Sequence, residues 1–130
     1  MATIYREVDL DADAEEAWRQ LADVGAVNKL IDYLGPVTVD GDRRSCSLGD
    51  QGELNELIVT VDHDRRRLAY SIRESPLNFT HHSASWQVTP EGDKSRLVWI
   101  TDVKPDSVAP ALEELIDQTA DSIKRNLSRA

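Results

Sequence analysis

The middle of the chain, residues 37–104, consists of short runs of alternating apolar and polar residues separated by turn-forming residues. The turns are rich in Gly, Asp, Asn, Ser and Pro, and they lie at residues 40–42, 49–52, 62–64, 75–78 and 90–93. Alternating runs joined by such turns are typical of antiparallel strands rather than of strand–helix–strand units. The region therefore predicts an antiparallel meander, with strands over residues 43–48, 53–61, 78–88 and 96–104 and another around residues 68–72.

The N-terminal part of the chain predicts one more strand and two short helices. Residues 4–10 alternate as a strand does. Asp13 and Glu16 have the spacing of a capping box, which begins a short helix. Gly25 is expected to end this helix, and residues 26–34 have the pattern of a second short helical segment.

A long amphipathic helix closes the chain, capped by Ser107 and running to about Leu127. Its apolar stripe consists of Val108, Leu112, Leu115, Ile116, Thr119, Ile123 and Leu127. A helix of about 20 residues is ~30 Å long and a strand of about ten residues is ~33 Å long. The helix can therefore lie along a curved sheet in an α+β fold, and the wedge between the two is a place for a small apolar ligand.

Length and charge narrow the class of protein. We expect one domain over residues 1–130, because a domain needs on the order of 100 residues. A net charge of −9 disfavours nucleic acid and anionic membranes as partners. The longest apolar runs are a few residues, so we expect no membrane span. The absence of a leader pattern at the first residues and a single cysteine favour a cytoplasmic protein.

The strand alternation predicts which side chains face the wedge between sheet and helix. In each strand we let the apolar residues set the inward face, which turns Glu56 outward. The predicted ligand-binding residues are Arg44, Cys46, Asn55, Leu57, Val59, Tyr70, Ile72, His82, Trp86, Trp99 and Thr101 from the strands and Leu112, Ile116 and Thr119 from the helix. An apolar lining with a few polar groups is typical of small-molecule pockets, although an ordinary filled core has the same pattern.

The same alternation leaves some apolar residues on the outer face. Val98 and Ile100, together with Ile58, form a modest apolar patch there. We therefore expect a monomer or a weak homodimer.

Motifs for metals, nucleotides and nucleophilic catalysis are missing from the sequence. His81 and His82 are neighbours in a strand, so they face opposite sides and cannot bind one metal ion together. No phosphate-binding glycine motif occurs. We therefore predict neither a metal nor a cofactor, and we expect Cys46 to be a small buried apolar residue.

Three inward residues are weak candidates for catalysis. His82 could transfer a proton, because histidine titrates near neutral pH. Tyr70, or Arg44, could polarise a carbonyl group of a substrate. Arg44 in an apolar cleft needs an anionic or carbonyl partner, which could be a ligand or a carboxylate of the protein itself.

Scattered motifs over nearly the whole chain resemble the START-like SRPBCC superfamily, in particular its bacterial polyketide cyclase/dehydrase and lipid transport branch. They are Ala17-Trp18-x-x-Leu21-x-Asp23, Asp42-x-Arg44 with Gly52 and Glu56, Asp62-x-x-x-Arg66-x-x-x-Tyr70, His81-His82-Ser83-Ala84-Ser85 and Trp99-Ile100-Thr101-Asp102-x-x-Pro105. The resemblance implies a helix-grip fold, in which a curved antiparallel sheet and two short helices enclose an apolar cavity under the C-terminal helix. It also implies lipids, polyketides or aromatic metabolites as ligands.

Three functions follow as hypotheses. The first is a binding protein for a small hydrophobic molecule. The second is an enzyme of the polyketide cyclase/dehydratase type that uses the same cavity. The third is an interaction or dimerisation module with a filled cavity.

Overall fold

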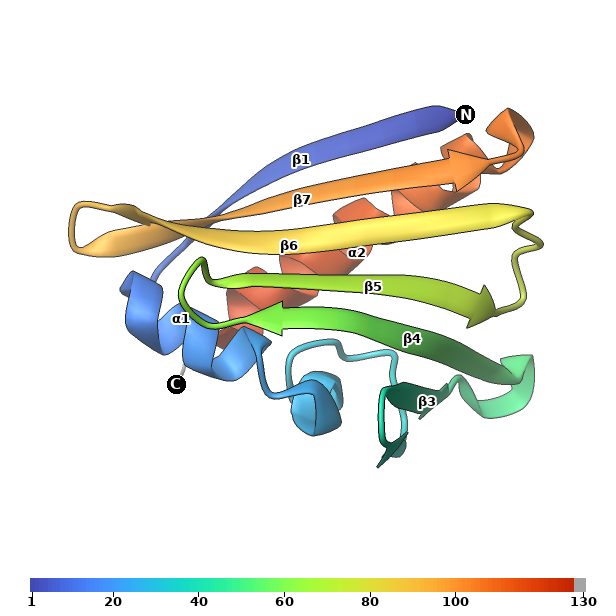
Figure 1. The fold of residues 1–130 in the computed structure, drawn as a ribbon, viewed down its shortest axis with the longest axis horizontal. Helices are drawn as coiled ribbons and strands as arrows, with labels where there is room; N and C mark the ends of the chain where they lie inside the picture. The colour runs from blue at the N-terminus through green and yellow to red at the C-terminus, as the bar shows by residue number, and fades with distance from the viewer. Residues whose placement is uncertain (128–130) are drawn as a thin grey trace.

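Seven antiparallel strands form one curved sheet in the order β1-β7-β6-β5-β4-β3-β2 (Figure 1). The strands are β1 (Ala2–Leu10), β2 (Val37–Asp40), β3 (Arg43–Ser47), β4 (Glu53–Asp62), β5 (Arg67–Glu74), β6 (His81–Glu91) and β7 (Lys94–Lys104). The structure is a computed structural model and describes residues 1–127, so residues 128–130 of the predicted domain lie outside the described residues. The predicted meander is confirmed, and β1 joins it at the edge beside β7.

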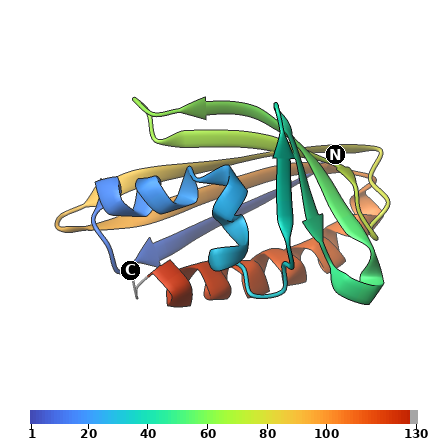
Figure 2. The ribbon, with the colours of Figure 1, turned by 90° about the horizontal axis from the view of Figure 1, so that it is seen from below.

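The long helix α2 (Ala109–Leu127) packs along one face of the sheet, as Figure 2 shows. A short 3₁₀ turn, η3 (Asp106–Val108), precedes it, so α2 begins two residues after the predicted cap at Ser107. Its buried side chains are Leu112, Ile116, Thr119, Ala120, Ser122, Ile123 and Leu127. A curved antiparallel sheet gripping one amphipathic helix is the helix-grip fold, and the predicted fold class is confirmed. None of the helices in residues 1–127 has the length and apolar character needed to cross a bilayer.

The first helix, α1 (Ala14–Leu21), begins where Asp13 caps it. The Asp13 side chain accepts a hydrogen bond from the backbone N–H of Glu16 at 2.8 Å. The predicted return bond of a capping box is absent from the described contacts, because the Glu16 carboxylate accepts from Arg19 and Gln20 instead. The helix ends at Leu21, before Gly25.

The second helical segment is shorter than predicted. Residues 26–34 were expected to be helical, but only η1 (Val24–Lys29) is, and as a 3₁₀ helix with a kink at Ala26. After η1 only isolated turn bonds remain, from Ile31 N–H to Val27 O and from Leu34 N–H to Ile31 O, and side chains of α2 hold the segment in addition. Its conformation depends on residues about 90 positions away in sequence, which local periodicity does not report.

Polar contacts fix the segment after η1 to the C-terminal half of α2. Ser122 Oγ donates to the carbonyl oxygen of Leu30 and accepts from the N–H of Asp32, each at 2.9 Å. Asn126 Nδ2 also donates to Leu30 O at 3.0 Å and to an Asp32 carboxylate oxygen at 2.8 Å. Arg125 forms an ion pair with Asp32. These contacts close one end of the space between sheet and helix.

The predicted orientation of β4 is wrong over residues 55–59, whereas Val61, also predicted inward, packs against the core. Asn55, Leu57 and Val59 were expected to face inward, yet Val59 is 60% exposed and Glu56 is buried. The run Leu57–Val59 is apolar on both faces, so apolar character could not decide between them. Ile58 packs against the core instead of joining an outer patch with Val98 and Ile100. The pairing of β4 with β5 is also irregular beside Asn55 and after Ile58.

The alternation of β6 and β7 is as predicted. Their buried residues include His82, Ala84, Trp86 and Val88 on β6 and Leu97, Trp99, Thr101 and Val103 on β7. Strand β6 begins at His81 rather than at Asn78. Thr80, which the alternation of a strand over residues 78–88 places on the inward face with His82, therefore precedes the strand and is exposed. Trp86 and Trp99 are register partners across the two strands, which places the two indoles side by side on the face that α2 covers.

Candidate functional site

A cavity of about 610 Å³ lies between the sheet and α2. Its volume is in the range of small-molecule sites, about 300–1,000 Å³. Ten of the predicted ligand-binding residues line it: Arg44, Tyr70, Ile72, His82, Trp86, Trp99, Thr101, Leu112, Ile116 and Thr119. Cys46, Asn55, Leu57 and Val59 do not line it. The space between sheet and helix is therefore not plugged by the three large aromatic residues of β5, β6 and β7.

Cavity residues that sequence reasoning missed come mostly from connecting segments. They are Val27, Ile31, Tyr33, Leu34, Leu48, Gln51, Leu54, Glu56, Ser75, Pro76, Leu77, Phe79, Ala111, Leu115 and Gln118. Loops such as η2 (Gly49–Gln51) and residues 75–79 have no periodicity from which an inward face could be predicted. Glu56 is the missed residue for which the sequence held a signal, because Arg44 in an apolar cleft needs an anionic partner such as a nearby carboxylate.

The cavity has an exposed mouth and a buried inner wall. The mouth is formed by the exposed lining residues Tyr33, Gln51, Pro76, Ala111 and Gln118. The inner wall is formed by Arg44, Glu56, Tyr70, His82, Trp86, Trp99 and Thr101, each at most 6% exposed. Access from solvent is thus alongside the first half of α2, from Ala111 to Gln118, before the turn that Ser122 fixes.

A buried ion pair lies in the inner wall. Arg44 Nε donates to Glu56 Oε1 at 2.8 Å, and the two side chains are 4% and 5% exposed. Arg44 also donates through Nη1 to the carbonyl oxygen of Val24 at 3.2 Å. The pair joins β3 and β4 to η1, and the internal carboxylate is the partner that Arg44 required.

Cys46 is completely buried behind this ion pair. Its Sγ lies 4.0 Å from Glu56 Oε1. Burial, and then the Glu56 carboxylate, raise the pKa of Cys46 to about 11, with Arg44 acting in the opposite direction. A neutral thiol with no exposure is not a nucleophile for a cavity ligand.

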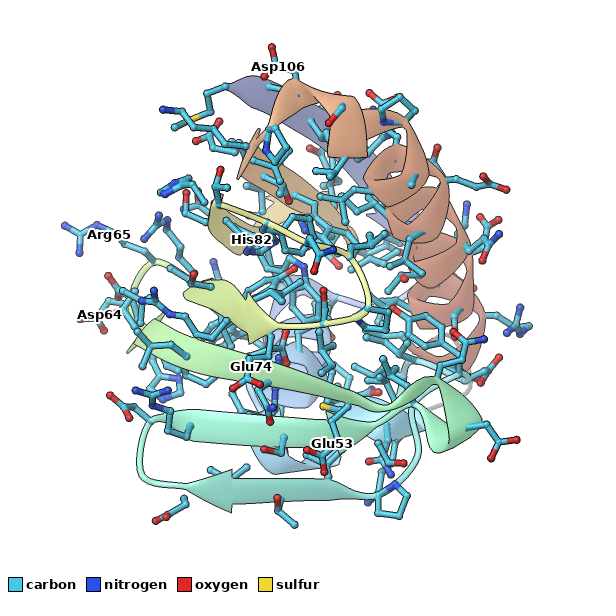
Figure 3. The ribbon with its side chains drawn as sticks, turned by 90° about the vertical axis from the view of Figure 1, so that its right-hand side faces the viewer. Glu53, Asp64, Arg65, Glu74, His82 and Asp106 are labelled. Carbon is cyan, nitrogen blue, oxygen red and sulfur yellow. The ribbon has the colours of Figure 1, made fainter. Side chains whose placement is uncertain are left out.

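His82 is held as a neutral imidazole. Its Nδ1 accepts the backbone N–H of Ile72 at 2.9 Å, so the ring proton is on Nε2. Burial, and then the neighbouring His81, lower the pKa of His82 to about 4. Figure 3 shows His82 in the interior between sheet and helix, whereas Arg65 points away from the molecule. At neutral pH His82 is therefore a hydrogen-bond donor through Nε2 rather than a proton donor for catalysis.

Aromatic rings make up much of the inner wall. Trp86 contacts Tyr70 and Trp99 edge to face, with ring centroids 5.9 and 5.5 Å apart. The Nε1 atoms of Trp86 and Trp99 and the hydroxyl of Thr101 are buried without a hydrogen-bond partner among the described residues. Burial, and then Glu56, raise the pKa of Tyr70, while Arg44 and the Trp99 indole act against this. Tyr70 is thus an un-ionised phenol.

Tyr33 spans the mouth from the segment after η1 to α2. The Thr119 hydroxyl donates to the carbonyl oxygen of Leu115 at 2.7 Å, so in the 2.9 Å contact with Tyr33 it is Tyr33 that donates. The Tyr33 side chain is 42% exposed. Burial of its hydroxyl end against the helix nevertheless raises its pKa.

The described residues hold no group of three or more His, Cys, Asp or Glu side chains that could bind a metal ion. The third histidine, His63, accepts the indole N–H of Trp18 at 3.1 Å, away from the cavity. Residues 1–127 therefore offer the cavity as the candidate site, with two formally charged side chains in its lining.

Comparison with protein families supplies the identification. The family described as polyketide cyclase / dehydrase and lipid transport matches residues 1–128. The chain belongs to this family. No curated protein sequence matches the chain.

Solved structures share the fold at low sequence identity. An uncharacterized protein from Bacillus thuringiensis has a TM-score of 0.89 at 16% identity, covering 97% of this chain and 98% of its own. A protein from Thermobifida fusca has a TM-score of 0.85 at 26% identity, covering 99% and 95%. Truncated norcoclaurine synthase from Thalictrum flavum has a TM-score of 0.71 at 20% identity, covering 95% and 91%. These likenesses extend over whole chains and support the helix-grip assignment.

Proposed function

We propose that this protein binds a small, mostly apolar molecule in the cavity between the sheet and α2. The observation that carries the proposal is a cavity of about 610 Å³ whose lining is largely apolar and whose mouth is open to solvent. The family description includes lipid transport. Norcoclaurine synthase, of the same fold, has been solved with dopamine and hydroxybenzaldehyde, so this fold accommodates aromatic molecules.

Binding without catalysis fits the inner wall better than a cyclase or dehydratase reaction does. His82, the candidate acid and base, uses Nδ1 in a backbone hydrogen bond and has a pKa of about 4. Arg44 is already paired with Glu56 and is not free to polarise a substrate carbonyl. The open cavity also argues against a module that acts only through its outer face.

The test is binding of a panel of fatty acids, flavonoids and polycyclic aromatic ketones, measured by thermal shift and calorimetry. Ligands of the folded state raise Tm by mass action. Ala111→Trp places a large ring at the mouth and should weaken binding at least tenfold. Glu114→Trp, an exposed position on α2 that does not line the cavity, should leave binding unchanged. Equal affinities of the two variants, or no ligand at all, would contradict the proposal.

Two further predictions concern the cell and the assembly. We predict a cytoplasmic location, and the single cysteine, Cys46, which is free and buried, supports it. The monomer or weak dimer is supported by the small outer patch, which lacks Ile58 and leaves Val98 and Ile100 half-buried.

A further inference from the structure

We infer that the cavity selects an uncharged ligand that presents a hydrogen-bond-accepting oxygen, such as an aryl ketone, to the inner wall. This inference rests on the proposed function, since it names the ligand class of the same cavity. The inference distinguishes two kinds of mostly apolar ligand. A neutral ketone needs a hydrogen-bond donor from the inner wall, whereas an ionised fatty acid needs a positive charge.

The charges of the cavity are compensated within the protein. Arg44 and Glu56 are the two formally charged residues of the lining at neutral pH, and they pair with each other at 2.8 Å. A ligand carboxylate would have to compete with Glu56 for Arg44, and a ligand ammonium would have to compete with Arg44 for Glu56. In both cases one buried charge is left without a partner, which is strongly unfavourable.

The overall charge and the mouth add to the selection against anions. The chain carries a net charge of −9, which repels an approaching carboxylate. The mouth residues Tyr33, Gln51, Pro76, Ala111 and Gln118 carry no charge that could offset this repulsion.

Several hydrogen-bond donors of the inner wall have no strong partner within the protein. His82 donates through Nε2 because Nδ1 is occupied by Ile72. The indole N–H of Trp86 and the Thr101 hydroxyl have no partner among the described residues. The Trp99 N–H is close enough to the Tyr70 hydroxyl to lower the Tyr70 pKa, but it does not complete a hydrogen bond with it. Aromatic faces nearby are only weak acceptors. A ligand oxygen at this end of the cavity meets unpaired donors, and each buried donor left unpaired costs stability.

The experiment compares four naphthalenes of one shape: 2-acetylnaphthalene, 2-ethylnaphthalene, 2-naphthoate and 2-naphthylmethylammonium. Their dissociation constants for the wild-type chain are measured by calorimetry at pH 7.5. We expect the ketone to bind about three- to tenfold tighter than the hydrocarbon, from one net hydrogen bond. We expect it to bind about tenfold or more tighter than either ion.

Two variants reverse the charge selection. Glu56→Gln frees the Arg44 charge, so 2-naphthoate should gain at least tenfold relative to the ketone. Arg44→Met frees Glu56, so the ammonium should gain instead. The wild-type comparison needs no variant, and it decides the question if either variant does not fold.

The outcomes separate the inference from the function beneath it. If either ion binds wild-type protein as tightly as the ketone, or the hydrocarbon does, the inference is wrong while the binding function stands. If none of the four probes binds, the inference is wrong, and the panel of fatty acids, flavonoids and polycyclic ketones decides the proposed function separately.

Discussion

Arg44 Nε and Glu56 Oε1 are 2.8 Å apart in a wall that solvent scarcely reaches, with both side chains at most 5% exposed. The two residues are directly opposite each other on β3 and β4. Arg44 also reaches Val24 O in η1. One ion pair therefore sets the orientation of β4, attaches η1 to the sheet and leaves the cavity without net charge.

Removing one partner of this pair should be costly, because it leaves a buried charge uncompensated. We expect Glu56→Gln or Arg44→Met to lower the free energy of unfolding by about 3–5 kcal/mol. The double variant Arg44→Met/Glu56→Gln should lose markedly less than the sum of the two single losses. Urea denaturation of the three variants measures this, and additive losses would show that the pair is not coupled.

The state of His82 predicts a pH dependence of stability. The folded protein keeps His82 neutral down to about pH 4, whereas the unfolded chain takes up the proton near pH 6.5. Between these values the unfolded state binds more protons, so the free energy of unfolding falls as the pH falls. The contribution, on the order of 3 kcal/mol, is complete above pH 6.5 and lost by about pH 4.

His82→Gln isolates this contribution from the carboxylates that titrate in the same range. Its stability should fall less steeply than that of wild type between pH 6.5 and 4.5, measured by urea denaturation. His81→Gln, at an exposed position on the same strand, should keep most of the wild-type slope, because burial is the larger cause of the low His82 pKa and His81 the smaller one. Parallel curves for His82→Gln and wild type would mean that His82 titrates normally.

Ser122 should be important for the closed end of the cavity. Ser122→Ala removes the acceptor of the Asp32 N–H and one of the two donors to Leu30 O. We expect a loss of about 1–3 kcal/mol in the free energy of unfolding and faster hydrogen exchange of the Asp32 amide. Ser107→Ala, in the exposed turn before α2, is the control. An unchanged exchange rate at Asp32 would exclude this role of Ser122.

Strong periodicity made the architecture predictable. The alternation of β6 and β7 and the stripe on α2 correctly placed Trp86, Trp99 and Ile116 beside the cavity. In these elements one face is apolar and the other is mostly polar over many positions, so the spacing of the apolar residues correctly predicts which face is buried.

Where the period is ambiguous, the interior could not be predicted. Leu57, Ile58 and Val59 are apolar in succession, and the inward face of β4 is decided by a charge on the neighbouring strand. The segment after η1 takes its conformation from Ser122 and Asn126, far along the chain. Contacts between residues so far apart in the sequence cannot be predicted from local patterns of apolar and polar residues.

The most direct measurement is the position of a bound ligand in solution. Isotope-filtered NMR of the complex with 2-acetylnaphthalene should give nuclear Overhauser effects from the ligand to Leu112 and Ile116 on α2 and to Trp86 on β6. Contacts instead to Val98 and Ile100 on the outer face, with none to α2, would contradict an internal binding site.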